Sequence, residues 1–360
     1  MKKTKIIKVK NYSLLKNDLY YDNGKDLFLN DVIIGKDVFA HRKSSEYIIG
    51  FKNVDGVKSS YIVRGGIGFD FEDGFYPNYI VGTSAFLRNK LSGDNKRWSY
   101  FMYDFKENTS NSYSEGYYFL GYPVRENDNL FHVDEDLKTI KNLHLPTETT
   151  LWQFDSSELG IEKISKIMGV FGEVLVVFGH KNTAQESYLS SVPDLPIFFG
   201  ISVANGSLLW QQDVVFMSGK NERDTHCRIS LPFLNNETGK VIIFEAGQYI
   251  EMDALTGEIC IWQNLHENPL SLNGLSMDPF FFDPCQVDES FIYFRTGIGE
   301  SSRRAGVGVF DRKKQELVAL EVLTDDSGNP VEMGPLKVQA TKDEIYALDL
   351  KQTLHIFERE

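Results

Sequence analysis

The chain has 360 residues, of which 42% are hydrophobic and 25% charged, and its formal net charge is −13. These values are ordinary for a soluble globular protein that buries a large core. The acidic balance argues against nucleic acid and against an anionic membrane surface as partners, because both need a basic surface. It favours a protein partner that is basic.

The first ten residues, MKKTKIIKVK, contain five lysines but lead into no long apolar segment and no small-residue cleavage site. The sequence therefore predicts neither a secretory signal nor a membrane span, since no run of 18 apolar residues occurs anywhere. Three cysteines without paired spacing predict no disulfide framework. We expect a cytoplasmic location with reduced thiols.

The first 130 residues alternate apolar and polar positions, which is typical of β-strands. Asn23-Gly24 and Asp55-Gly56 each lie between two such segments, and these dipeptides are strong hairpin signals. The segment KTKIIKVK near the start also alternates. We expect it to pair beside TLHIFERE at the end of the chain and so to close a ring of sheets.

Beyond residue 130 a repeating unit emerges, in which a strand, a polar turn and an apolar strand follow one another. Its steps are uneven and average roughly 50 residues, which is the size of one four-stranded propeller blade. Five segments share the unit: NLFHVDEDLKTIKNLHL, FFGISVANGSLLWQQD, YIEMDALTGEICIWQN, GVGVFDRKKQELVALEVL and EIYALDLKQTLHIFERE.

Three of the four tryptophans lie in one phrase, an apolar residue followed by Trp-Gln, at Trp152, Trp210 and Trp262. With the preceding Asp-x-x-Thr-Gly of residues 253–257, this pattern resembles the tryptophan-docking repeat of the PQQ-like β-propellers. The resemblance is close over 247–264, good over 198–213 and faint before residue 130.

The resemblance implies that Trp210 and Trp262 each pack flat against the next blade. It also implies that Asp253, Thr256 and Gly257 form the turn that receives such a ring. Trp152 fits the same role, although LWQFDSS could instead begin a strand–turn unit of its own. In the last two units Leu320 and Phe357 replace the tryptophan, so a different contact is expected there.

The fold class predicted is all-β, a β-propeller of four-stranded antiparallel blades. About seven blades are expected, with six or eight as alternatives. No linker rich in Pro, Gly or Ser divides the chain, so we expect a single domain over residues 1–360. Its blades are degenerate over 1–130 and recognisable repeats over 131–360.

The sequence offers little catalytic chemistry. The quinone-dependent dehydrogenases that share the PQQ-like propeller are longer and carry adjacent cysteines, which this chain lacks, so we expect no cofactor. His226-Cys227 has no second pair at zinc-ligand spacing, so no metal is expected. No G-x-S-x-G elbow occurs either. A triad whose members converge only in space stays open.

The remaining candidate is a binding surface, for which Arg303-Arg304 could hold a carboxylate or a phosphate. The first hypothesis is a non-catalytic, cytoplasmic, bacterial protein-binding propeller, and specifically an immunity protein that neutralises a basic toxin. One alternative is an enzyme that acts on a small molecule or sugar at the central channel, and another is an assembly scaffold. The sequence leaves the oligomeric state unknown.

Overall fold

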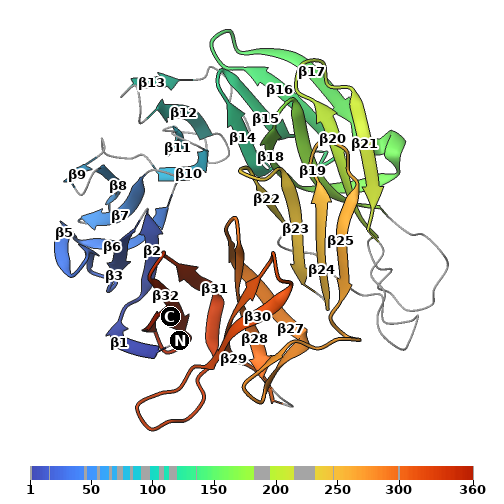
Figure 1. Cartoon of the computed structure of the whole chain (residues 1–360). Helices are drawn as coiled ribbons and strands as arrows, with labels where there is room; N and C mark the ends of the chain where they lie inside the picture. Colours follow the sequence, from blue (N-terminus) through green and yellow to red (C-terminus); the bar gives the residue numbers. More distant parts are fainter. Residues whose placement is uncertain are drawn as a thin grey trace, which may run out of the picture. The chain divides into compact units, whose positions relative to one another are not determined.

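A computed structural model gives the fold of the chain (Figure 1). It describes residues 2–15, 17–43, 47–54, 57–64, 67–70, 76–81, 84–90, 98–104, 109–112, 120–134, 136–181, 195–214, 232–245, 247–298 and 301–359. Within these ranges only the backbone is described for residues 2–6, 42, 53–61, 64–122, 195, 279–281, 298, 301–304 and 335–337.

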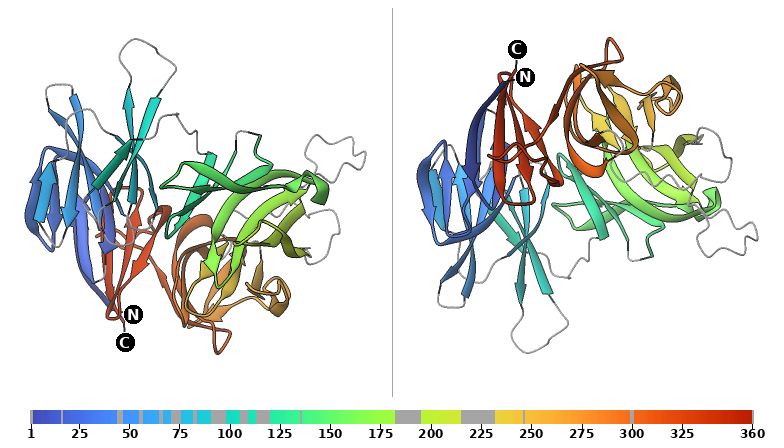
Figure 2. Two further views of the ribbon diagram at one scale, coloured as in Figure 1. Left: turned by 90° about the horizontal axis from the view of Figure 1, so that it is seen from above. Right: turned by 90° about the horizontal axis from the view of Figure 1, so that it is seen from below.

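The described residues form β-strands, turns and one 3₁₀ helix, Ser156–Leu159, with no α-helix among them. Within this described part, no helix has the length and apolar character needed to cross a membrane. The strands pair into eight antiparallel sheets, each of which is twisted (Figures 1 and 2). The number of sheets equals the largest number of blades that the sequence predicted.

The chain forms two compact units, and the first consists of residues 1–117 and 323–360. It holds four sheets of four strands. These are β31 (Met333–Ala340), β32 (Glu344–Asp349), β33 (Thr353–Glu358) and β1 (Lys2–Lys8); β2 (Asn11–Leu15), β3 (Asp18–Asp22), β4 (Asp26–Leu29) and β5 (Val32–Lys36); β6 (Val38–Lys43), β7 (Ile48–Val54), β8 (Val57–Arg64) and β9 (Ile67–Asp70); and β10 (Tyr76–Val81), β11 (Ser84–Lys90), β12 (Trp98–Asp104) and β13 (Thr109–Ser112).

The second unit spans residues 118–322. It holds three sheets of four strands and one of five. These are β14 (Leu120–Glu126), β15 (Asn129–Val133), β16 (Thr139–His144) and β17 (Thr149–Asp155); β18 (Ile161–Phe171), β19 (Val174–Lys181), β20 (Leu195–Ser202) and β21 (Leu208–Asp213); β22 (Phe233–Asn235), β23 (Lys240–Glu245), β24 (Gln248–Asp253) and β25 (Ile259–Asn264); and β26 (Ser271–Leu272), β27 (Leu275–Val287), β28 (Phe291–Ile298), β29 (Ser301–Asp311) and β30 (Glu316–Val322).

The predicted pairing of the two chain ends is confirmed. β1 runs antiparallel to β33, with Ile7 opposite Leu354 and Lys8 opposite Thr353. The Lys8 ammonium donates a hydrogen bond of 2.5 Å to Thr353 Oγ1. The first strand of the chain thus completes the sheet formed by the last three.

The predicted hairpins of the first 130 residues are also present as strand pairs. β3 and β4 flank Asn23-Gly24, and Gly24 has a φ of +87°. β7 and β8 flank Asp55-Gly56, although these two turn residues lie outside the described part. Three sheets, β2–β5, β6–β9 and β10–β13, occupy the region where two or three degenerate blades were expected. The prediction of a single domain stays a prediction.

Within the second unit, the sheet that contains β23 packs on both faces and contributes to two cores. β23 (KVIIFE) shows this directly. Val241 and Ile243 pack into the core shared with β18–β21, whereas Ile242 and Phe244 pack into the core shared with β26–β30. Successive side chains of a strand point to opposite faces, so a continuous apolar run serves two cores.

Candidate interaction surface

The last strand of five sheets begins in the same way. A residue with positive φ ends the turn, the third residue after it forms a one-residue β-bulge, and the fourth resumes the ladder. The residues with positive φ are Asp31, Glu148, Gly206, Gly257 and Gln315. The corresponding bulge residues are Ile34, Leu151, Leu209, Cys260 and Val318. The residues that resume the ladder are, in the same order, Gly35, Trp152, Trp210, Ile261 and Ala319.

This geometry corrects two of the five predicted repeat copies. In their sheets, NLFHVDEDLKTIKNLHL and EIYALDLKQTLHIFERE form the second and third strands, β15–β16 and β32–β33, rather than the third and fourth. Phe357 is therefore not equivalent to Trp210. Leu320 is not equivalent either, because Ala319 holds the position after the bulge and Leu320 stands one residue later. The sequence pattern of strand, polar turn and strand is shared by every hairpin of such a sheet, which is why it did not separate the two kinds.

Trp152 and Trp210 each lie against the turn glycine of the next sheet. A Cβ built on Gly206 would meet Cδ2 of Trp152 at 2.8 Å, and a Cβ built on Gly257 would meet Cδ2 of Trp210 at 2.8 Å. Both side chains are only 9% exposed. Trp152 Nε1 also donates a 2.8 Å hydrogen bond to the Val203 carbonyl of the next sheet. Both tryptophans therefore seal a seam between neighbouring sheets.

Asp253, Thr256 and Gly257 form the turn beneath Trp210. Asp253 Oδ1 accepts hydrogen bonds from the backbone N–H groups of Leu255 at 2.9 Å and Thr256 at 3.1 Å. Together with the Lys240 ammonium, 3.1 Å from Asp253 Oδ2, these hydrogen bonds lower the pKa of Asp253 against the opposing effect of burial. An acceptor at this position and a glycine with φ of +74° fix the turn on which the ring rests.

Trp262 differs from its expected role, because it does not lie on the next sheet. Its side chain is 51% exposed, and its Nε1 donates a 2.7 Å hydrogen bond to Gln248 Oε1 of its own sheet. The residue that follows the bulge is Ile261, which pairs with Glu251, so Trp262 stands one position later, opposite Ile250. A shift of one residue turns a strand side chain to the other face.

The neighbouring turn also lacks the glycine that such a ring requires. Gln315 holds the positive-φ position there, with φ of +56°. Ile261 instead packs against the core that the β22–β25 and β26–β30 sheets share, which includes Leu317 and Leu320. Ile261, which is smaller than tryptophan, therefore fills this seam, and the indole of Trp262 is exposed.

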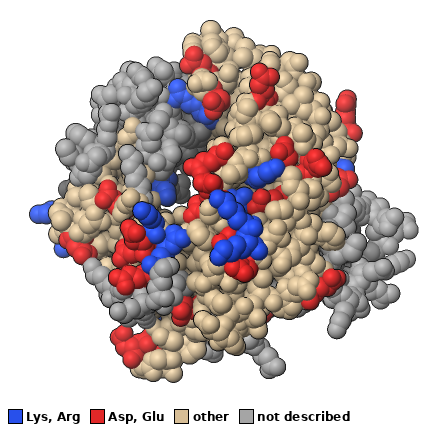
Figure 3. All heavy atoms as spheres, viewed as in Figure 1, with Lys and Arg blue, Asp and Glu red and all other residues tan. Residues whose placement is uncertain are grey.

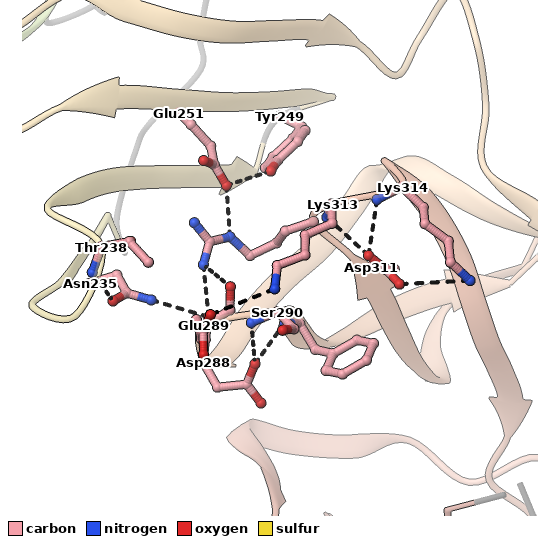
Figure 4. A network of polar contacts seen from close by, with 12 residues as sticks. Asn235, Thr238, Tyr249, Glu251, Asp288, Glu289, Ser290, Asp311, Lys313 and Lys314 are labelled. Atoms are coloured by element: carbon pink, nitrogen blue, oxygen red, sulfur yellow. Dashed lines mark hydrogen bonds and ion pairs between the residues drawn. The ribbon is translucent and has the colours of Figure 1, made fainter.

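A buried ion pair also joins these two sheets (Figure 4). Arg312 Nε donates to Glu251 Oε1 at 2.7 Å, and Arg312 Nη1 donates to the carbonyls of Asp288 and Glu289 at 2.8 and 2.9 Å. The Tyr249 hydroxyl donates to the same Glu251 oxygen at 2.5 Å. Burial is the main cause that raises the pKa of Tyr249, and the carboxylate of Glu251 raises it further. The two buried charges, on Glu251 and Arg312, therefore neutralise each other within the protein.

One group of side chains in the first unit has the connectivity of a Ser-His-Asp triad. His41 Nδ1 lies 2.7 Å from Asp22 Oδ2, and His41 Nε2 lies 3.1 Å from Ser13 Oγ. All three are buried, with Ser13 7% exposed. A nucleophilic serine must bring its hydroxyl to a substrate carbonyl, and this hydroxyl is enclosed. The trio instead ties β2 and β3 to β6 of the next sheet.

Other predicted features add no site. Among the described residues, no group of three His, Cys, Asp or Glu side chains could hold a metal ion. His226 and Cys227 lie outside the described residues, and the side chains of Arg303 and Arg304, whose backbone belongs to β29, are likewise not described. Lys240 Nζ lies 3.2 Å from the Sγ of Cys260, and Cys260 is exposed.

The β25 surface remains, which we define as the exposed side chains of Glu258, Ile259, Cys260, Trp262 and Glu267. Among the residues whose side chains the structure describes, Trp262 is the only aromatic among the exposed large hydrophobic residues. On the face in Figure 3, the described Lys and Arg side chains lie next to acidic ones. An exposed tryptophan held by a hydrogen bond is the kind of residue that dominates protein interfaces.

No family model and no curated protein matches the sequence. Many solved structures resemble the chain, and two of them match it over nearly its whole length. One is BamB from Moraxella catarrhalis, at 12% identity with a TM-score of 0.50, where the match covers 99% of this chain and 97% of that one. The other is Saccharomyces cerevisiae Sqt1, at 10% identity with a TM-score of 0.57, where the match covers 100% of both chains.

This chain is a β-propeller. BamB is a PQQ-like propeller and Sqt1 a WD40 propeller, so the fold is shown, while membership of the PQQ-like family stays a prediction. Within this propeller, sequence reasoning missed the β25 surface because it treated Trp262 as equivalent to Trp210. The signal was present in the spacing: three residues separate Gly206 from Trp210, but four separate Gly257 from Trp262.

Proposed function

We propose that this propeller is a non-catalytic protein-binding module that acts in the cytoplasm and recognises a basic protein. The observation that carries the proposal is the position of Trp262, which is turned out of the core and is fixed by Gln248. Tryptophan is among the residues that most often dominate the binding energy of protein interfaces, and a fixed ring loses little entropy on binding. The net charge of −13 supports a basic partner.

Two observations support a binding role over an enzymatic one. The Ser13–His41–Asp22 trio is enclosed, and the Arg312–Glu251 pair is satisfied within the protein. A toxin that this chain neutralises is one basic partner that would fit the proposal. The choice of a toxin is supported by the net charge alone. An assembly scaffold would use the same kind of surface.

The test is affinity capture of the tagged full-length chain from its native cells, followed by measurement of the partner's affinity with purified proteins. We expect a near-stoichiometric protein with a high isoelectric point. Trp262→Ala should weaken its binding by about tenfold or more. Leu151→Ala is the control, because Leu151 is 55% exposed on the last strand of another sheet. Capture of no stoichiometric protein, or equal losses for the two variants, would contradict the proposal.

A further inference from the structure

Among the strands that the structure describes, none pairs with the outer edge of β25. β25 is the last strand of its sheet, and its pairing with β24 occupies only one side. The backbone N–H of Leu265 donates to the Gly247 carbonyl at 2.7 Å, and Asn264 stands opposite Gln248. Because inward-bonded and outward-facing residues alternate in an antiparallel ladder, the N–H and C=O of Trp262 point away from β24, to the outer edge.

The edge is regular where the indole stands. The bulge at Cys260 interrupts the ladder, but Ile261, Trp262, Gln263 and Asn264 pair with four consecutive residues of β24. An edge strand is usually protected by bulges, charges or a short length. Here the bulge lies before Trp262 and not beside it, and the N–H and C=O of Trp262 face the edge. At the next outward-facing residue, the carbonyl of Asn264 accepts a 3.3 Å hydrogen bond from the N–H of Asn268, so the pairing segment of the edge centres on Trp262.

The side chains along this edge give it a chemical preference. Ile259 and Trp262 pair with Met252 and Ile250, which stand two residues apart on β24, so both project on one face of the sheet. Ile259 is 37% exposed and Trp262 51%. These two side chains offer an apolar contact to a side chain of an added strand.

Carboxylates flank the apolar contact. Glu258 precedes β25 and Glu267 follows it, and both are exposed. No described cation forms an ion pair with either, whereas Lys240 neutralises Asp253 and Lys181 neutralises Asp213. Glu258 stands four residues before Trp262, and Glu267 stands five residues after it, in the turn that follows β25. The pattern complements a segment with an apolar centre and basic ends.

We propose that the edge of β25 binds an extended basic segment of the partner protein by β-strand addition, with an apolar side chain of that segment against Trp262. This inference rests on the proposed function and specifies the site and the chemistry of its partner. Main-chain hydrogen bonds to the edge would supply affinity, and the indole and the two glutamates would supply specificity.

The probe is a short capped peptide of alternating Thr and Val with a central Phe and two Arg at each end. The matched control replaces every Arg by Glu. Binding to the full-length chain is measured by calorimetry at low and at moderate salt. We expect the Arg peptide to bind at least about tenfold more tightly than the Glu peptide, with a preference that salt reduces. Glu258→Lys together with Glu267→Lys should reverse the preference.

Backbone N-methylation tests the strand addition itself. A peptide methylated at alternate residues loses the hydrogen bonds of one edge only, so the two alternate methylation patterns should differ in affinity by about tenfold or more. Trp262→Ala should weaken the Arg peptide to a similar extent, while Leu151→Ala should not. Circular dichroism confirms that the variants, which change exposed side chains only, remain folded.

The inference is overturned if the Arg and Glu peptides bind equally, if neither binds, or if both methylation patterns are tolerated. It is also overturned if sedimentation shows that a second copy of the chain occupies the edge in a manner that depends on Trp262. If a native partner is captured through Trp262 while the peptides fail, only this inference fails. If no native partner is captured, the proposed function fails as well.

Discussion

The indole of Trp210 lies over the α-carbon of Gly257 in the next sheet, so close that a Cβ on that residue would stand 2.8 Å from Cδ2 of the ring. The glycine has a φ of +74°, and the tryptophan is 9% exposed. The seam thus depends on two features of one residue, its left-handed backbone and its missing side chain. Two variants can separate their contributions.

Gly257→Ala should lower the free energy of unfolding by about 2–4 kcal/mol. About 1 kcal/mol comes from forcing an alanine into the left-handed region, and the remainder comes from displacement of the ring. Gly274→Ala is the matched control, because its φ is +78° and nothing lies within 4 Å of its added Cβ. Urea unfolding at one temperature measures both. Equal losses would show that the ring yields without cost.

The exposed and the buried tryptophan should respond differently to truncation. Trp210→Ala removes a ring from the core between two sheets and should cost about 3–5 kcal/mol of stability. Trp262→Ala removes an exposed ring with one hydrogen bond and should cost less than about 1 kcal/mol. Thermal or urea unfolding of both variants measures the two losses of stability. A large loss for Trp262→Ala would mean that the indole supports the fold rather than a partner.

Local features of the fold could be predicted from the sequence, because alternation and turn residues are written in short segments. The Asn23-Gly24 hairpin is of this kind. The pairing of β1 with β33 is not local, and it was predicted because a ring of sheets must close. The number of sheets was less certain, because uneven loops blur the mean spacing. The orientation of Trp262 was predicted wrongly, because Trp262 lies one residue farther from its turn glycine than Trp210 does. This difference in spacing can be read in the sequence.

The contacts that join separate repeats could not be predicted. Glu251 and Arg312 belong to different sheets and stand 61 positions apart, so no spacing rule links them. Ser13, Asp22 and His41 meet only because three strands of two sheets converge on them. Such polar contacts depend on the angle and distance between sheets, which a single sequence does not encode in any local pattern.

The Glu251–Arg312 pair should be costly to break from one side. Glu251→Leu leaves a buried guanidinium without its carboxylate, and Arg312→Met leaves the carboxylate without its guanidinium. Each should cost about 3–5 kcal/mol. The double variant should cost clearly less than the sum of the two, because it removes both charges. A double-mutant cycle in urea measures the coupling, and simple additivity would contradict the buried ion pair.

The stability of the second unit should fall on mild acidification because of His132. The side chain is 5% exposed on β15, and burial lowers its pKa to about 4. An unfolded chain would bind the proton with a pKa near 6.5. Between these two values the unfolded state holds more protons than the folded state, so stability falls as pH falls from about 6.5 to about 4. The loss from this residue alone should approach about 3 kcal/mol at pH 4.

The measurement is the free energy of unfolding at several pH values for the wild-type chain and for His132→Gln, which cannot gain the charge. The variant should be less stable at neutral pH if packing suffers, but its slope between pH 6.5 and 4 should be shallower than that of the wild type. His144→Gln is the control, because His144 lies at the surface and contacts Thr147 Oγ1 at 2.8 Å. If His132→Gln keeps the wild-type slope, His132 does not cause the loss of stability on acidification. The imidazole would then be protonated or solvated in the folded state, and the prediction would be wrong.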